Sequence, residues 1–127
     1  MTRPLRLTGI VGAILAGLAV AFGAFGAHGL RSIVTSEHLQ VFETGVRYQM
    51  YHAIGMIIAS LVPETLPHAH RASTAAWCFG AGTVLFSGSL YLLVLTNAHW
   101  LGIITPVGGL LFLAGWVLFA LAFAGRK

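Results

Sequence analysis

The chain has 127 residues, of which 57% are hydrophobic and only 8% are charged. Soluble domains carry about a quarter charged residues, so this composition excludes an ordinary soluble domain and predicts an integral membrane protein. The formal net charge of +4 comes from basic residues that flank apolar runs, which argues against a nucleic-acid-binding surface. We expect residues 1–127 to form a single transmembrane domain.

Four hydrophobic segments predict an all-α fold, a four-helix transmembrane bundle. We place the spans at about residues 7–28, 45–62, 72–96 and 101–124, with an amphipathic outer extension of the second span over residues 36–45. The first segment also resembles a secretory signal, because a basic lead precedes it. It is longer than the usual apolar region of such signals, so we interpret it as a span.

The second segment is the least apolar of the four. Its continuous apolar part, residues 53–62, makes only about 15 Å of helix, whereas a bilayer core needs about 30 Å. If this segment spans the membrane, Arg47, Gln49 and His52 lie below the surface, where ionisable groups are costly and usually paired. Glu43 and Arg47 stand four residues apart in the order that favours an ion pair, so we predict a buried pair.

Small residues at helical spacing predict close packing between helices. Such ridges let two backbones approach in lipid, and we favour packing within the chain over a dimer face. The predicted packing positions are Gly9, Ala13, Gly17, Gly23, Gly26, Gly80, Gly108 and Gly109.

The connections carry capping and turn signals. Thr35 or Ser36 can cap the second helix. His68 and His70 lie in a proline-containing turn without a third ligand, so we expect no metal site there. Pro106 either kinks the last helix or begins it after a short re-entrant stretch.

The distribution of basic residues predicts the orientation. Four spans put both termini on one side, together with five of the seven basic residues: Arg3, Arg6, Arg71, Arg126 and Lys127. By the positive-inside rule, this side is cytoplasmic. Polar residues of several elements then converge in the outer half, where we expect one intramembrane cluster of His28, Glu43, Arg47, Gln49, His52, Tyr91 and Thr105.

Four stretches together resemble a known family. They are GAFGAHGL at residues 23–30, FETGVRYQMYH at 42–52, GSLYLLVLT at 88–96 and LGIITPVGGLLFLAGW at 101–116. Over nearly the whole chain they are similar to the YgdD-like family of small inner-membrane proteins. The resemblance implies a four-helix, multi-pass protein of the bacterial inner membrane, and it brings no established activity.

Three functions are open for the polar cluster. In the first, the small-residue ridges and the Glu43–Arg47 pair dock a structural or accessory subunit into a membrane assembly. In the second, Glu43, Arg47, Gln49 and His52 serve transport or conduction, which in so small a chain requires a homo-oligomer. In the third, His28 and His52 bind haem or a metal.

We favour the structural or accessory function. No acid–base or metal motif accompanies the histidines, so we expect no enzyme activity, no catalytic residues and no cofactor. The expected partners are the lipid bilayer and either further copies of the chain or other membrane subunits.

Overall fold

The computed structural model describes residues 3–124, with side chains over residues 6–124. The described elements are α1 (Arg3–His28), η1 (Leu30–Ser32), α2 (Ser36–Ser60), α3 (Ala69–Thr96), η2 (His99–Ile103) and α4 (Thr105–Phe123). The α segments are α-helices and the η segments are short 3-10 helices. No strand occurs among the described residues, so the all-α prediction is confirmed for this part of the chain.

Apolarity identifies three of the four predicted spans. The stretches Arg6–Ser32, Ala69–Thr96 and His99–Phe123 are long and apolar enough to cross a membrane. They contain α1, α3 and α4. Of the described helices, α2 falls short of this measure, although its 25 residues make about 37 Å of helix. Apolarity therefore does not by itself identify α2 as a span.

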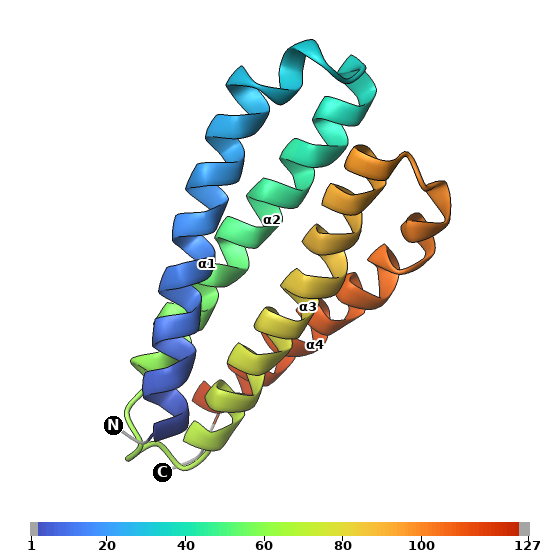
Figure 1. The fold of residues 1–127 in the computed structure, drawn as a ribbon. Coiled ribbons are helices and arrows are strands. Elements are labelled where there is room, and N and C mark those ends of the chain that lie inside the picture. The colour runs from blue at the N-terminus through green and yellow to red at the C-terminus, as the bar shows by residue number, and fades with distance from the viewer. Residues whose placement is uncertain (1–2, 125–127) are drawn as a thin grey trace.

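The least apolar helix, α2, is the central one. It packs between α1 and α3, and α4 packs mainly on α3 (Figure 1). A side chain of α4 also reaches α2, because Trp116 bonds His52. The α1–α2 hairpin and the α3–α4 hairpin diverge at the end that holds η1 and η2 (Figure 1). The helices thus form an open row in which the most polar helix contacts the other three.

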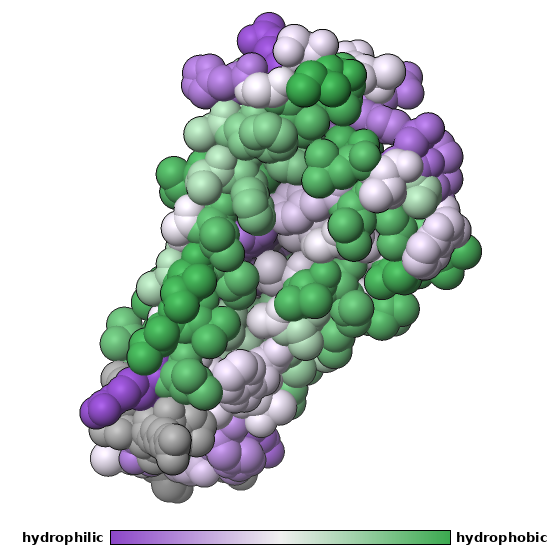
Figure 2. Space-filling view, in the orientation of Figure 1, coloured by the Kyte–Doolittle hydropathy of each residue, from purple (hydrophilic) through white to green (hydrophobic). Residues whose placement is uncertain are grey.

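The outer surface of the helices is strongly apolar. Large hydrophobic side chains are exposed on α1, α3 and α4, as at Val20, Val84 and Leu110. Figure 2 shows hydrophobic residues over much of one face and hydrophilic residues gathered toward its ends. A surface of this kind fits contact with lipid acyl chains.

Local signals set several helix ends. Thr35 caps α2 by accepting a hydrogen bond from the His38 N–H at 3.2 Å. Beyond α3, Asn97 has a φ of 58°, a left-handed conformation that asparagine tolerates better than most residues. Pro106 lies in the first turn of α4, after η2, so it begins the last helix and does not kink it.

One end of the molecule gathers the start of α1, the end of α2, the start of α3 and the end of α4 (Figure 1). Arg71 Nη1 donates to the Leu121 carbonyl at 3.2 Å and ties α3 to α4 there. Arg6 is exposed near the start of α1. The remaining basic residues predicted for this end lie outside the described residues: the side chain of Arg3, Arg126 and Lys127.

Several of the predicted packing glycines lie at helix contacts. Gly9 lies against Ser60, and Gly108 is so close to α3 that a Cβ atom there would collide with the backbone nitrogen of Phe86. Gly109 is looser, because a Cβ atom would lie 3.9 Å from the Phe86 ring. Three further predicted positions contact a side chain of another helix: Gly23, Gly26 and Gly80.

Ala13 and Gly17 do not pack as predicted. Both are exposed, and nothing lies within 4 Å of the place where a Cβ atom of Gly17 would stand. A strict four-residue repeat rotates by about 40° at each step, since a helical turn has about 3.6 residues. The row that begins at Gly9 therefore leaves the contact face. Gly12 packs on α2 instead, where its Cβ atom would lie 2.8 Å from the Ala53 carbonyl oxygen.

The close approach at Gly108 generates a prediction. Gly108→Ala should lower the free energy of unfolding by about 1–3 kcal/mol, because the added methyl group overlaps the Phe86 backbone. Gly17→Ala is the control, and it should keep or raise the stability, because alanine is the better helix former and nothing obstructs it. Unfolding of both variants in the same detergent measures the difference. Equal effects would contradict the close packing of α3 on α4.

Candidate functional site

Gln49 of α2 is a buried amide that joins three helices. Its side chain is 3% exposed. Its Nε2 donates to the Leu15 carbonyl of α1 at 2.8 Å, and its Oε1 accepts a hydrogen bond from the Tyr91 hydroxyl of α3 at 2.7 Å. Both ends of the amide are thus satisfied inside the protein, as a polar group in a low-dielectric region requires.

A glycine makes the Gln49–Tyr91 contact possible. A Cβ atom at Gly45 would lie 2.7 Å from the Tyr91 ring, so a larger residue would block the path of Tyr91 across α2. The Gly45 carbonyl also accepts a 2.6 Å hydrogen bond from Ser87, and both residues are buried. Gly45 and Ser87 are not among the residues predicted for the site. Nothing local distinguishes them, because their partners lie on another helix.

His52 is the second buried polar residue of α2, and it bonds toward α4. Its Nδ1 lies 2.7 Å from the Tyr48 carbonyl, and its Nε2 lies 3.0 Å from Trp116 Nε1. A carbonyl can only accept and an indole N–H can only donate, so the proton must lie on Nδ1 and the ring is neutral. The imidazole also stacks on Phe112, with ring centroids 3.5 Å apart.

These contacts bear on the haem or metal hypothesis. Both ring nitrogens of His52 are engaged, so neither is open to a metal in this arrangement. His28 is exposed at the end of α1, whereas His52 is buried on α2. Within residues 6–124, no group of three or more His, Cys, Asp or Glu side chains could hold a metal ion.

The expectation of one polar cluster is wrong, because the structure divides its members. Gln49 and Tyr91 bond each other, whereas His52 bonds α4. Thr105, at the start of α4, shares a 2.6 Å hydrogen bond with Ser89 of α3, which also bonds back to its own helix. Trp116, which completes the His52 site, was missed because a tryptophan within an apolar run carries no local sign of a buried partner.

The predicted buried ion pair between Glu43 and Arg47 is also wrong. Arg47 is exposed, and its Nη2 donates to Thr44 Oγ1 at 3.2 Å. Glu43 is half-buried, and no ion pair joins it to Arg47 in the described part of the chain. Their spacing permits a pair, but Thr44 offers a hydroxyl one turn away. In addition, the face that carries both charges points away from the helices that pack on α2.

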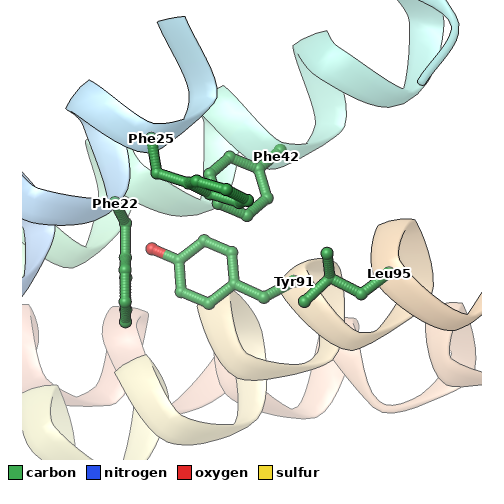
Figure 3. A pocket seen from close by; sticks show the side chains of 5 residues that line it. All are labelled: Phe22, Phe25, Phe42, Tyr91 and Leu95. Atoms are coloured by element: carbon green, nitrogen blue, oxygen red, sulfur yellow. The ribbon is translucent and has the colours of Figure 1, made fainter. Parts of the chain in front are cut away.

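An apolar cavity of about 120 Å³ lies beside the Gln49 site, where the two hairpins diverge. Figure 3 shows Phe25 and Phe42 on one side of the Tyr91 ring, Phe22 next to its hydroxyl end and Leu95 toward its opposite, backbone end. Tyr91 is 5.2 Å from Phe22 and 4.9 Å from Phe42 between ring centroids. This lining offers dispersion and ring contacts, and it provides no polar path between the hairpins.

Comparison with known proteins identifies the family. Residues 22–109 match the family model described as "Protein of unknown function (DUF423)". The chain belongs to this family. UPF0382 membrane protein YwdK from Bacillus subtilis (strain 168) is 48% identical over 113 residues, which cover 89% of this chain and 92% of YwdK.

A second relative extends over more of the chain. UPF0382 membrane protein SAB0533 from Staphylococcus aureus (strain bovine RF122 / ET3-1) is 44% identical over 124 residues, which cover 95% of this chain and all of that protein. No solved structure matches the chain. The expectation of an uncharacterised membrane-protein family is therefore confirmed, although the family found is DUF423 and the YgdD-like name is not shown.

The Gln49 site generates a prediction about stability. Tyr91→Phe should lower the free energy of unfolding by about 0.5–1.5 kcal/mol, because Gln49 Oε1 loses its buried donor. Tyr48→Phe is the matched control and should have no measurable effect, since Tyr48 is 39% exposed. Equilibrium unfolding in bicelles measures both variants. A control that loses as much stability as Tyr91→Phe would contradict a structural role for this bond.

The His52 site generates a prediction about its tautomer. Nitrogen NMR of the protein labelled at histidine should show His52 neutral, with the proton on Nδ1 and not on Nε2. Trp116→Phe removes the indole donor and should shift the Nε2 resonance. The exposed His99 serves as the internal control, and its resonances should not move. A proton on Nε2 in the parent protein would contradict the described hydrogen bonds.

Proposed function

We propose that this protein is a structural or accessory component of a bacterial inner-membrane assembly and has no enzymatic activity. One contrast supports the proposal. Gln49, His52 and Ser87 each bond another helix, so their polar groups hold the fold together. Glu43 and Arg47 take no part in these bonds and face outward. Charges on a helix that lies in a membrane require a partner, and no described residue outside α2 supplies one here.

In this proposal α2 is the fourth span. Its length of about 37 Å suffices, and its polar residues Gln49 and His52 are covered by the three apolar helices. Its exposed side chains toward the α2–α3 connection are apolar: Ile54, Ile58 and Leu61. Polar groups inside and apolar groups outside are what a lipid environment demands.

Four spans also determine the orientation in the proposal. The start of α1 and the end of α4 then lie on one side with Arg6 and Arg71, and the positive-inside rule assigns that side to the cytoplasm. The chain between α1 and α2 and the η2 segment face the opposite side.

Cysteine labelling tests this topology. In a Cys78→Ala background, an impermeant maleimide should label Ile33→Cys from outside intact spheroplasts, since Ile33 is 75% exposed between α1 and α2. Thr65→Cys, between α2 and α3, should react only after the membrane is permeabilised. Labelling of both positions from the same side would show that α2 does not cross the membrane.

Charge variants test the accessory function in the native membrane. In mild detergent, the parent protein should migrate as a complex larger than the 13.4 kDa monomer with its bound detergent. Arg47→Gln should reduce the yield of that complex, because the outward charge is lost. Arg31→Gln makes the same change at an exposed site on η1 and should leave the complex intact. A monomer throughout would contradict the proposal.

Transport by an oligomer is the second candidate, and one observation favours it. Thr83 is 3% exposed, and its Oγ1 has no hydrogen-bond partner among the described residues. It lies one turn from Ser87, whose hydroxyl bonds the Gly45 carbonyl of α2, so it is a further polar group of α3 near this contact. If the protein has the accessory function, liposomes that contain the parent protein should show no more ion flux than liposomes without protein. Flux that falls on Thr83→Val, but not on the exposed Thr74→Val, would establish transport instead.

A further inference from the structure

One face of α2 is left uncovered by the other described residues. We call it the α2 outer stripe, and it consists of Glu43, Arg47, Tyr51, Ile54, Ile58 and Leu61. From Arg47 onward these residues recur after four, three, four and three positions, which keeps them on one side of a helix. They are exposed except for Glu43, which is half-buried. The residues of α2 that contact α1, α3 and α4 lie on the opposite side, as Gln49 and Met56 do.

The charged part of the stripe lies below the membrane surface if α2 spans, and in this respect the inference rests on the proposed function. Gly23 of α1 lies beside Val46 of α2. The middle of the α1 apolar run, residues 7–27, is six residues before Gly23, so Arg47 lies about 8 Å above the middle of the membrane. The hydrocarbon half-thickness is about 15 Å. Glu43 lies one turn farther out.

Contact with lipid acyl chains would be unfavourable for the charges of Glu43 and Arg47. Apart from the hydroxyl of Thr44, the Arg47 guanidinium has no hydrogen-bond partner within the described chain, and Glu43 forms no ion pair there. Ionisable side chains at membrane depth face protein or water and are usually paired. The opposite charges of Glu43 and Arg47 make the stripe complementary to itself.

We propose that two copies of the chain associate through their α2 outer stripes, with Glu43 of each copy paired to Arg47 of the partner subunit. A two-fold axis along the membrane normal brings equal depths together, and such an interface is self-complementary. Along the α2 axis, Glu43 lies about one turn, or about 6 Å, farther out than Arg47. An arginine side chain that extends toward the outer surface can span this offset and reach Glu43 of the partner subunit. Arg47 already extends that way toward Thr44. Below the charges, Ile54 and Ile58 form an apolar seam.

A lipid phosphate would satisfy only half of this surface. It could accept hydrogen bonds from Arg47, but it would leave Glu43 unpaired and would add a second negative charge beside it. A second copy supplies both signs at the right depths, so the charge pattern favours self-association.

Charge reversal tests the proposal, because it should create a dimer of unlike chains. Glu43→Arg places two positive charges on the stripe, and Arg47→Glu places two negative charges there. Each variant alone should lose self-association by about tenfold or more, measured by co-purification of two differently tagged copies. Co-expression of the two variants should restore association, and the double variant with both changes should again pair with itself.

Controls separate the interface from a folding defect. Arg31→Glu is the matched charge reversal outside the stripe, and it should associate like the parent. Each variant is checked by circular dichroism and thermal unfolding. If a reversal does not insert, Glu43→Gln and Arg47→Gln replace the pair, and each should weaken association several-fold. Folded reversal variants that associate like the parent, or that fail to recover when mixed, would overturn the proposal.

Disulfide trapping tests the lower part of the same seam. In a Cys78→Ala background, Ile58→Cys should form a cross-linked dimer in native membranes, since equal positions meet across a two-fold axis. Val20→Cys on α1 is more exposed, at 63% against 50% for Ile58, but lies off the stripe and should stay monomeric. Equal cross-linking at both positions would show random collision and would overturn the proposal.

The outcomes also separate this inference from the proposed function. If no self-association occurs, but the stripe variants still lose a complex with a different subunit, the accessory function stands and the second copy does not. If the chain is monomeric in every experiment and the stripe variants change nothing, both fail.

Discussion

The amide of Gln49 sets the constraint on which the arrangement of the helices depends. In a membrane, a buried polar group must find its partners within protein, since lipid offers neither donors nor acceptors. Gln49 meets this requirement by bonding α1 and α3 at the same time, at 2.8 and 2.7 Å. The amide keeps both bonds only while α2 lies between these two neighbours. The central position of α2, between α1 and α3, follows directly.

The remaining contacts between the helices depend on the close approach of their backbones at two glycines. Gly45 lets the Tyr91 ring pass α2, and Gly108 lets α4 approach the backbone of Phe86 on α3. With α4 held this close, Trp116 reaches His52 and Phe112 stacks on its ring. The glycines therefore act on the polar network as well as on packing: without them the donors and acceptors would stand too far apart to bond.

The two sides of α2 have different tasks in this scheme. On the inner side, the polar groups of Gln49 and His52 form hydrogen bonds that hold the helices together. These groups are therefore not available as ligands or as acid–base groups. The outer side carries opposite charges that no described residue pairs, above exposed apolar residues. An apolar cavity between the hairpins adds ring surface but no polar path. This division is the reason that a docking function suits the geometry better than an enzyme or a haem site.

The sequence by itself determined the membrane class, the four helices and the position of the α2 cap to within one residue, at Thr35 or Ser36. These depend on composition and on the helical period, which are local properties. The sequence did not determine which residues the buried polar groups bond. Gln49 bonds a residue 34 positions away, and His52 bonds one 64 positions away. The four-residue spacing of Glu43 and Arg47 is compatible with an ion pair, but it is equally compatible with two unpaired charges that point outward. Only the tertiary structure decided between these outcomes, because the rotation of α2 against its neighbours determines which face is covered.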